Sequence, residues 1–504
     1  MKVFSNMSWV GVLLGSLFFI ALTLTIVLCR ALPAHAATIT VTNALDDNSA
    51  GSLRQLVSSA NAGDTITFAP GYFNSARTIT LTRQIVITKS LTIDGSSASI
   101  TPTISGGNIT RTFYTTAGTF VTLNHISIIN GNAAINNGGG IYNAGVLNVS
   151  HSSFISNSAT ALSGIDDGGA IYNAGTLTVS HSVFISNTAN YGGGIRNNGT
   201  ATVSDSSFYR NRSLSSGGAV MNGGTFALNI NANLSSADVI MPYPRIPDSI
   251  SGSPVMTMKI IHSTFTDNAA AYGAGVWSDS TLTLIDSEFS HNAAIVSGGA
   301  LFNGFSIATL SNSTIYSNTA QFGGGIYNAS GPLTVTNATI VTNSATIEGG
   351  AIMNEGLITA TNVTFAGNIS SLGSTVAVTG TAVIMKLVMR NTIVLYAAGQ
   401  DGCYGNVVDG GYNLESGITC NLTATHSLQN SNPLLAALKI NMPGINVSTM
   451  ALLSGSPAIN TGNNAVCPST DERGIPRMVN NVCDIGAFEF WSATYTAYLP
   501  LMLR

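Results

Sequence analysis

Three histidines recur at one position of a repeated pattern, three residues before a phenylalanine: His151, His181 and His262. Imidazoles on neighbouring repeats could share a transition metal. The other repeats carry Asp or Asn at this position, and His, Asp and Asn all favour turns. We therefore interpret the column as a structural corner in preference to a metal site. We expect no metal and no other cofactor.

Two pairs of adjacent acids could supply catalytic groups. Asp166 and Asp167 lie in one of the longer repeats, and Asp46 and Asp47 lie near the N-terminus. Paired carboxylates act as general acid and base in polysaccharide cleavage. The sequence shows neither the Gly-His-Gly partner of polygalacturonases nor the cluster of Asp with Arg or Lys typical of Ca-dependent lyases. We interpret both pairs as solvated turns and expect no catalytic residue.

A column of aromatic residues is the best candidate for a binding site. The same column also accepts Arg196 and two methionines, so we expect it to face outward. Stacked rings could form a platform for sugar rings or for a protein partner. The alternative, which we favour, is a lateral ladder that stiffens the sheet. The rings are Tyr142, Tyr172, Trp277, Phe302 and Tyr327.

Charged residues concentrate near the last two cysteines. We expect a salt-bridged cap there, with a Ca²⁺ site as the alternative. The residues are Asp471, Glu472, Arg473, Arg477, Asp484 and Glu489.

Four cysteines follow the export signal described below, and an exported chain favours disulfides. Four cysteines allow three pairings. We predict the nearest-neighbour one, Cys403 with Cys420 and Cys467 with Cys483.

The elements that carry these residues repeat along the chain. A first signature, such as GGGIYN, ends at positions 143, 173, 197, 222, 278, 303, 328 and 354. A second, Phe or Ile followed three residues later by Asn, recurs in phase with it. A period of about 25 residues is typical of a solenoid. The recurring Asn predicts a buried ladder of amides, formed by Asn157, Asn187, Asn211, Asn268, Asn292, Asn318, Asn343 and Asn368.

Between the signatures apolar residues alternate with polar ones, as Leu177 and Val179 do, which predicts short strands. No helix-length apolar pattern separates these strands. The only clear helix expected after the signal runs from about 51 to 63, with a capping box of Ser52 and Gln55 at its start. Its apolar face, with Leu53 and Val57, should cover an open end of the strands. The sequence therefore predicts an all-β protein, a single-stranded right-handed parallel β-helix with a short N-terminal capping helix.

The chain divides into five parts. Residues 1–36 read as a signal peptide, with an uncleaved membrane anchor as the alternative. Residues 37–125 form the N-terminal cap and first coils, and 126–396 the β-helix repeats. A Pro-rich insertion at about 228–255 is interpreted as a surface loop. A different C-terminal region spans 397–490, and an apolar tail spans 491–504.

Three stretches resemble known families. The paired signatures over about 130–368 are similar to the repeats of polymorphic outer membrane proteins and related right-handed β-helix proteins. GSLRQLVSSANAGDTITF resembles the N-terminal cap of secreted bacterial β-helix proteins. The end, SGSPAINTGNNAVCPSTDERGIPRMVNNVCDIGAFEF, with GGYNL and SNPLL before it, resembles the choice-of-anchor Q domain. That family usually carries an Asn-Gly-Gly…Thr-His stretch where NMPGINVSTM stands, and often a sorting signal where only the apolar tail follows.

The resemblance implies an exported surface or extracellular protein and no particular reaction. Charged residues are only 8% and hydrophobic residues 45% of the 504 residues, which excludes ordinary disorder, and the net charge of −4 does not suggest nucleic acid. We expect a monomer that binds surface glycans or another protein, and that meets a membrane only through its signal or an unidentified anchor. A non-enzymatic adhesin-like or envelope scaffold is the main hypothesis. A polysaccharide lyase or glycosidase on the same fold is the alternative.

Overall fold

The computed structural model describes residues 36–133, 137–160, 167–224, 256–379, 385–441, 447–477 and 481–491. The expected signal peptide up to residue 35, the Pro-rich insertion, Asp166 and the tail after Trp491 lie outside the described residues. The predictions made for them therefore stay predictions.

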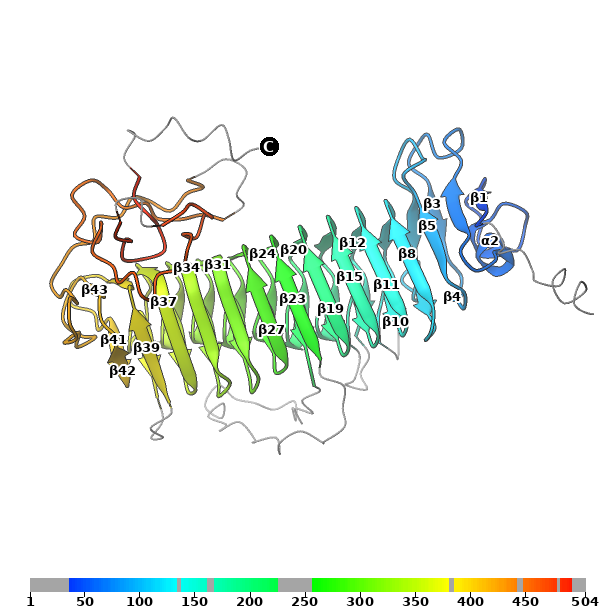
Figure 1. Cartoon of the computed structure of the whole chain (residues 1–504). Coiled ribbons are helices and arrows are strands. Elements are labelled where there is room, and N and C mark those ends of the chain that lie inside the picture. Colours follow the sequence, from blue (N-terminus) through cyan, green and yellow to red (C-terminus); the bar gives the residue numbers. More distant parts are fainter. Residues whose placement is uncertain are drawn as a thin grey trace, which may run out of the picture.

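The described chain winds into a parallel β-helix, seen from the side in Figure 1. One rung consists of β10 (Ile141–Asn143), β11 (Val146–Ser150), β12 (Ser153–Ile155) and β13 (Ser158–Ala159). Every pairing between strands of successive rungs is parallel, as in β11 with β15 (Thr176–Ser180). The predicted fold, an all-β right-handed parallel β-helix, is confirmed.

Three sheets result from this winding, of 24, 12 and 7 strands. We call them sheets A, B and C in that order. Sheet A contains β1 (Thr38–Val41), β2 (Thr65–Phe68), β3 (Thr78–Thr80), β5 (Leu91–Asp94), β6 (Thr103–Ser105), β8 (Phe120–Asn124), β9 (Ser127–Ile129), β11, β12, β15, β16 (Val183–Ile185), β19 (Thr200–Ser204), β20 (Ser207–Tyr209), β23 (Thr257–Ile261), β24 (Thr264–Thr266), β27 (Thr281–Ile285), β28 (Glu288–Ser290), β31 (Ala308–Tyr316), β34 (Leu333–Val341), β37 (Leu357–Ala366), β39 (Lys386–Arg390), β40 (Ile393–Leu395), β42 (Val407–Asp409) and β43 (Leu414–Glu415).

The other two sheets are built from shorter strands. Sheet B contains β4 (Ile85–Ile87), β7 (Phe113–Thr115), β10, β14 (Ile171–Asn173), β18 (Ile195–Asn197), β22 (Val220–Asn222), β26 (Val276–Ser278), β30 (Leu301–Asn303), β33 (Ile326–Asn328), β36 (Ile352–Asn354), β38 (Val376–Val378) and β41 (Cys403–Gly405). Sheet C contains β13, β17 (Thr188–Tyr191), β21 (Arg212–Ser216), β25 (Ala269–Tyr272), β29 (Ala293–Ser297), β32 (Thr319–Phe322) and β35 (Ser344–Glu348). Because β41, β42 and β43 still stack on earlier rungs, the β-helix continues past the boundary expected at 396.

Identical side chains stack inside the β-helix. Phe184 is fully buried, and its ring lies 4.8 Å from that of Phe154 and 4.6 Å from that of Phe208. The alternating residues of each strand point inward in register, so Leu177 faces Ala201 and Ala201 faces Met258. The core is therefore one continuous apolar column along the axis.

Buried asparagines form ladders at two corners. In the column that the sequence singles out, Asn187 Nδ2 donates to Asn211 Oδ1 at 2.9 Å and also reaches the carbonyl of Phe154. The pattern repeats from Asn157 to Asn368. A second ladder starts at Asn143, whose Nδ2 donates to Asn173 Oδ1 at 2.7 Å. Ser278 interrupts this second ladder, and Asn303 Oδ1 beyond it has no hydrogen-bond partner among the described residues. The other amides pair with one another and with the backbone in the interior, where an unpaired polar group is costly.

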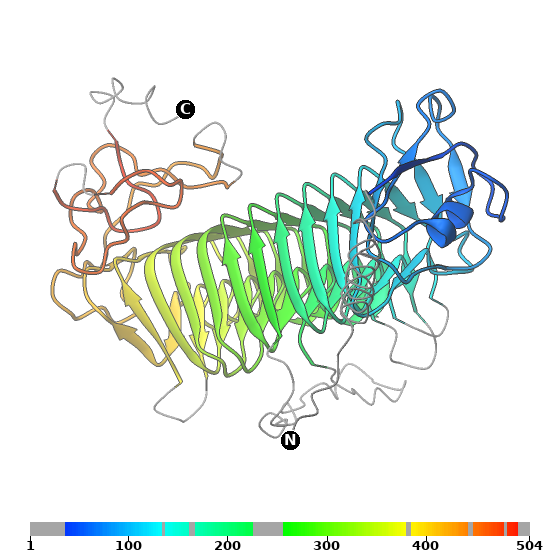
Figure 2. The same ribbon diagram turned by 45° about the vertical axis from the view of Figure 1, so that its right-hand side comes forward.

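The helix α2 (Leu53–Ser59) lies at the N-terminal end of the rungs (Figures 1 and 2). Ser52 caps it by accepting a hydrogen bond from the Gln55 amide at 3.3 Å. The Gln55 side chain donates to Ser59 Oγ, so the expected capping box is only half formed. Leu53 and Val57 are buried, and together they cover apolar residues that the end of the solenoid would otherwise expose.

At the opposite end, irregular chain folds back onto the outer face of sheet A (Figure 1). We call residues 447–477 and 481–491 the C-terminal segment. It bonds to β31, β34 and β37, for example through Asn337 Nδ2, which donates to the Thr470 carbonyl at 2.7 Å, and Asn362 Nδ2, which donates to the Asp484 carbonyl at 3.0 Å. No helix in the described residues is long and apolar enough to cross a membrane.

Candidate functional site

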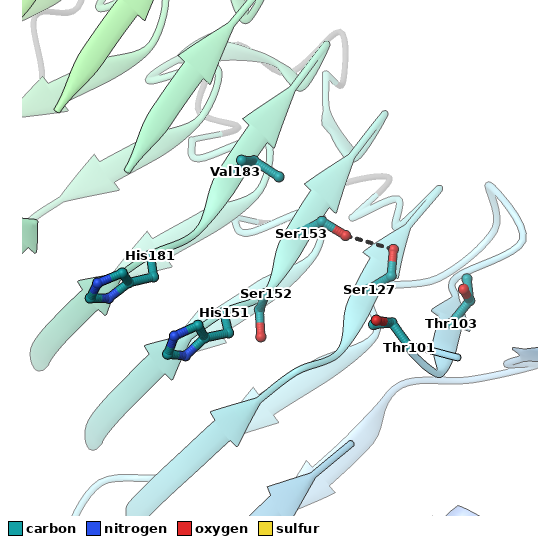
Figure 3. A pocket seen from close by; sticks show the side chains of 8 residues that line it. All are labelled: Thr101, Thr103, Ser127, His151, Ser152, Ser153, His181 and Val183. Carbon is teal, nitrogen blue, oxygen red and sulfur yellow. Dashed lines mark hydrogen bonds between the residues drawn. The ribbon is translucent and has the colours of Figure 1, made fainter. Parts of the chain in front are cut away.

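A pocket of about 490 Å³ opens on the outer face of sheet A near its N-terminal end (Figure 3). None of its lining side chains is acidic, and none is Lys or Arg. Hydroxyl and imidazole groups dominate it. Each hydroxyl can both donate and accept hydrogen bonds, and each neutral imidazole offers one donor and one acceptor. The lining residues are Thr101, Thr103, Ser127, His151, Ser152, Ser153, His181 and Val183.

The pocket is the open end of a longer row of side chains. Strand register places one residue per rung at the same outward position, and most of these residues carry hydroxyls. We call this set the hydroxyl row, although Val183 and Glu288 interrupt it. In rung order it is Thr103, Ser127, Ser153, Val183, Ser207, Thr264, Glu288, Thr314, Thr339 and Thr364.

Histidines border the pocket at the corner between two strands of sheet A. The rings of His151 and His181 stack at 4.8 Å, and His125, which the sequence analysis did not include, stacks on His151 at 4.7 Å. His151 and His181 have φ of 47° and 46°, the left-handed conformation of a corner. Because the rings are parallel, their faces lie against each other and their nitrogens do not point toward a common point, as they would around a shared metal ion. His262 lies apart from them, between Asp205 and Asp286 at 3.7 and 3.2 Å.

The aromatic column of sheet B stacks but does not face solvent. Exposure is 8% for Tyr172, 2% for Trp277 and Phe302, and 4% for Tyr327, and only Tyr142 is half-buried. The prediction of an outward, accessible platform is therefore wrong for four of the five rings.

The reason lies in the corner between sheets C and B. A second column of rings precedes the glycines of the first signature and packs against the aromatic column: Tyr191, Tyr272 and Phe322. Gly273, at φ 57°, lets the chain turn directly over the rings, since a Cβ there would lie 2.9 Å from the Trp277 Cβ. In this conformation the rings stabilise the sheet and offer no face to a sugar.

A buried guanidinium interrupts this column. Arg196 is fully buried, its Nε donates to Asp167 Oδ2 at 3.2 Å, and its Nη1 donates to the Gly223 carbonyl. Its Nη2 is buried without a hydrogen-bond partner among the described residues. Burial raises the pKa of Asp279, although the nearby charge of Arg196 opposes that shift. The solvated-turn interpretation is wrong for Asp167, which is 2% exposed.

The pair near the N-terminus is corrected only in part. Asp46 is ion-paired with Arg54 at 2.7 Å, with its side chain only 4% exposed. Asp47 is exposed and accepts hydrogen bonds from Ser49 in a local turn, as predicted. No repeat marks either ion pair in the sequence, because Arg54 lies on helix α2 and Arg196 lies one rung away from Asp167.

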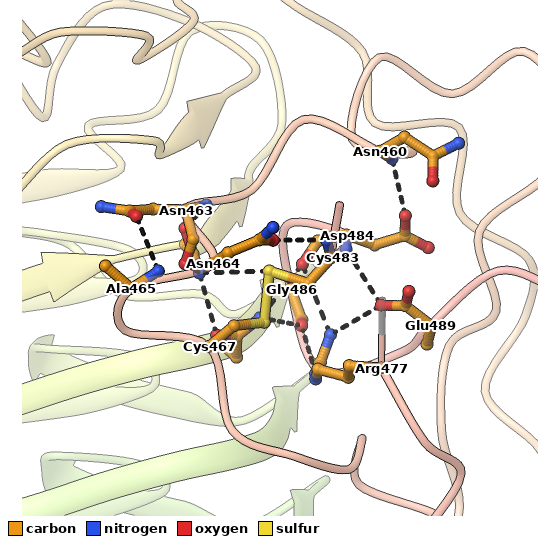
Figure 4. Close-up of a disulfide and its surroundings, with 12 residues drawn as sticks. Asn460, Asn463, Asn464, Ala465, Cys467, Arg477, Cys483, Asp484, Gly486 and Glu489 are labelled. Carbon is orange, nitrogen blue, oxygen red and sulfur yellow. Dashed lines mark hydrogen bonds and ion pairs between the residues drawn. A yellow bond between two sulfur atoms is a disulfide. The ribbon is translucent and has the colours of Figure 1, made fainter. Parts of the chain in front are cut away.

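The charged residues near the C-terminus form a buried network (Figure 4). Arg473 Nη2 pairs with Asp471 at 2.6 Å, and Arg477 Nη1 pairs with Glu489 at 3.3 Å, as a salt-bridged cap requires. Burial, reinforced by Glu489, raises the pKa of Asp484 to about 7.

The predicted disulfide pairing is confirmed. Cys403 joins Cys420, and Cys467 joins Cys483 beside the charged network. Two disulfides indicate that the chain matures in an oxidising compartment outside the cytosol.

The hydroxyl row, the second asparagine ladder and the stacking of His125 were not predicted from the sequence. The signal for the row was present, since Ser or Thr precedes Phe154, Phe265 and most of their equivalents. Hydroxyl residues are so frequent in this chain that one more column of them did not stand out. Among the described residues, no group of three or more His, Cys, Asp or Glu side chains is placed to hold a metal.

Comparison with known proteins gives no family. No family model matches the chain, and no curated protein matches it, so the resemblances to polymorphic outer membrane protein repeats and to the choice-of-anchor Q domain stay predictions.

Three solved structures of similar fold are polysaccharide lyases. A pectate lyase matches with a TM-score of 0.39 and 13% identity over 90% of this chain and 96% of its own. A PL6 alginate lyase in complex with a trisaccharide matches with 0.43 and 10% identity over 88% and 96%. A PL6 family polysaccharide lyase from Pseudopedobacter saltans matches with 0.40 and 11% identity over 78% and 91%. Likeness at this level indicates no shared substrate or reaction.

Proposed function

We propose that this protein is an exported β-helix that binds a neutral polysaccharide along the hydroxyl row. The observation that carries the proposal is the pocket at the open end of the row, lined by hydroxyls and imidazoles and by no charged side chain. Sugar hydroxyls also donate and accept, so such a wall can satisfy them in many orientations. Ordered rungs place one such group about every 4.8 Å, which suits an extended chain of repeating units.

The chemistry of the lining favours binding over cleavage. Glycosidases need two carboxyl groups across the scissile bond, and none of the lining residues is acidic. Elimination at a uronate needs a cation against its carboxylate and a base for the proton. The pocket offers imidazoles but no Arg or Lys. A role as a surface or secreted scaffold that holds glycan follows from this.

The test is a binding panel of neutral and uronate polysaccharides with the variant Ser153→Val. Val183 occupies the equivalent position on the next rung, so the substitution copies a residue that the fold already accepts. Loss of one hydroxyl should weaken binding about three- to tenfold. Thr178→Val is the matched control, because Thr178 is an exposed outward hydroxyl on β15 outside the pocket. Equal binding by parent and Ser153→Val would contradict the proposal.

Polysaccharide cleavage is the second candidate, and Arg196 is the observation that favours it. It brings a guanidinium, Asp167 and Asp279 together on the outer side of sheet B, which is the combination that the sequence analysis did not find. The guanidinium is fully buried, so cleavage would require this site to open. Formation of unsaturated uronate products, abolished in Arg196→Lys, would replace the binding proposal with a lyase. Their absence with retained glycan binding supports the scaffold.

A further inference from the structure

The C-terminal segment covers one end of the hydroxyl row. Thr314, Thr339 and Thr364 are at most 1% exposed, whereas Ser127 and Ser153 at the other end are half-buried. The covering contacts are polar. The Ala487 amide donates to Thr364 Oγ1 at 2.9 Å, and Glu472 reaches both other threonines. The segment therefore occupies positions that continue the open pocket.

Glu472 is 1% exposed and lies between two threonine hydroxyls of sheet A. Thr314 Oγ1 lies 2.5 Å from the Ser448 carbonyl oxygen and 3.1 Å from Glu472 Oε1, so its one proton is shared between two acceptors. The Thr339 amide donates to Glu472 Oε1 at 3.2 Å, and the Thr339 hydroxyl donates to Oε2. Burial raises the pKa of Glu472 well above its usual range, although these hydrogen bonds oppose the shift, and it thereby favours the protonated acid in the docked segment.

Among the described residues, no cation is placed to pair with Glu472 if it ionises. On its own segment Arg473 is paired with Asp471, and Arg477 with Glu489, while Asp484 is a further acid of the same network.

On the facing rungs, Glu288 accepts from the Ser448 amide at 3.2 Å and from the Tyr316 hydroxyl at 3.1 Å. An ionised Glu472 would thus be an unpaired buried charge between acids, which is strongly unfavourable.

We infer that the C-terminal segment is a cover latched by the proton of Glu472, and that deprotonation releases it from β31 and β34. The released face would add Thr314 and Thr339 to the open hydroxyl row. Since a proton bound more tightly in the docked state stabilises that state, docking is strongest at acid pH. It weakens as the pH rises through the docked pKa of Glu472.

Hydrogen–deuterium exchange of the full chain at about pH 5.5 and about pH 8.5, corrected for intrinsic rates, tests the latch. Protection of residues 447–477 and of β31 and β34 should fall at least about tenfold at the higher pH, equivalent to one pKa unit of linkage. Glu472→Gln, which is neutral at every pH, should keep its protection. Unchanged protection in the parent, or the same fall in Glu472→Gln, would overturn the inference.

Three variants make the assignment specific. Asp267→Asn removes a solvent-accessible acid on β24's turn and should behave as the parent does. Asp484→Asn should retain the pH dependence, and its loss there would assign the latch to Asp484 instead. Thr314→Val removes the hydroxyl that donates to the Ser448 carbonyl and to Glu472, and it should lower protection even at about pH 5.5. Full protection in Thr314→Val would contradict the role of this contact in docking.

The consequence for ligand binding rests on the proposed function. A long neutral polysaccharide from the panel should bind the parent more tightly at about pH 8.5 than at about pH 5.5, and Glu472→Gln equally at both. A pH-dependent protection without any glycan binding would contradict the proposed function and leave the latch in place. Glycan binding without pH-dependent protection would contradict the latch and leave the proposed function in place.

Discussion

Phe184 lies at the centre of the phenylalanine stack, with a ring on the rung before and the rung after. Phe184→Ala should cost about 3–5 kcal/mol, because it leaves a cavity that two rigid rungs cannot close. A urea or thermal unfolding curve measures the loss. Val183→Ala is the matched control on the same strand, where the side chain is 38% exposed and should cost under about 1 kcal/mol. A similar small cost for Phe184→Ala would mean that the inward column is misassigned.

Single residues were predictable where one column repeats. The inward phenylalanines and the first asparagine ladder follow from eight copies of one pattern. Arg196 was not predictable in the same way, because its partner Asp167 is 29 residues away and no repeat marks the pair. Its outward position is right, but the ion pair and the folded-back corner keep water from it. A column of the repeat predicts whether a side chain points into or out of the β-helix. It does not predict which other residues cover an outward side chain.

The disulfide next to the charged network should hold the loop from Cys467 to Cys483, which are 16 residues apart. Replacing both cysteines by Ala should lower the free energy of unfolding by about 3 kcal/mol in the chain-entropy model. The loss of stability should be local to the C-terminal segment. Limited proteolysis locates the loss, and peptide mapping of the non-reduced protein recovers the link. The Cys403–Cys420 pair, 17 apart, is the control, since its removal should loosen β41 instead. Free thiols at all four positions would contradict both the pairing and the inferred export.

Elements were predictable where local signals agree, and the helix α2 shows the limit. Its start at Ser52 follows from the capping serine, and its buried face from Leu53 and Val57. The C-terminal segment had no such signal. Its placement depends on Asn337, Asn362 and Thr364, which bond to chain more than 100 residues away. An irregular segment that is held by contacts with distant residues has no periodic pattern in its own sequence, so its position could not be predicted.

The strand register runs through the insertion as if it were absent. Ala201 pairs with Met258, and Met258 with Leu282, so the rungs on either side already stack directly. Replacing residues 228–255 by a short Gly-Ser turn should therefore leave folding intact, because loop closure depends weakly on length. Circular dichroism and the unfolding midpoint check this.

Unfolding of the deletion variant would mean that the insertion is part of the core. A folded variant that loses glycan binding would move the binding site from the pocket to the insertion. A folded variant that binds as the parent does would support the hydroxyl row.

The stacked rungs also set a length scale. Nine rung steps separate Thr103 from Thr364 in register, which at about 4.8 Å a step makes roughly 43 Å. The first asparagine ladder runs along most of this distance, and both ladders resist sliding of one rung over the next. The molecule is consequently a stiff spacer. It holds the open pocket at a fixed distance from the end that carries the C-terminal segment, and a flexible tether of equal residue count could not keep that distance.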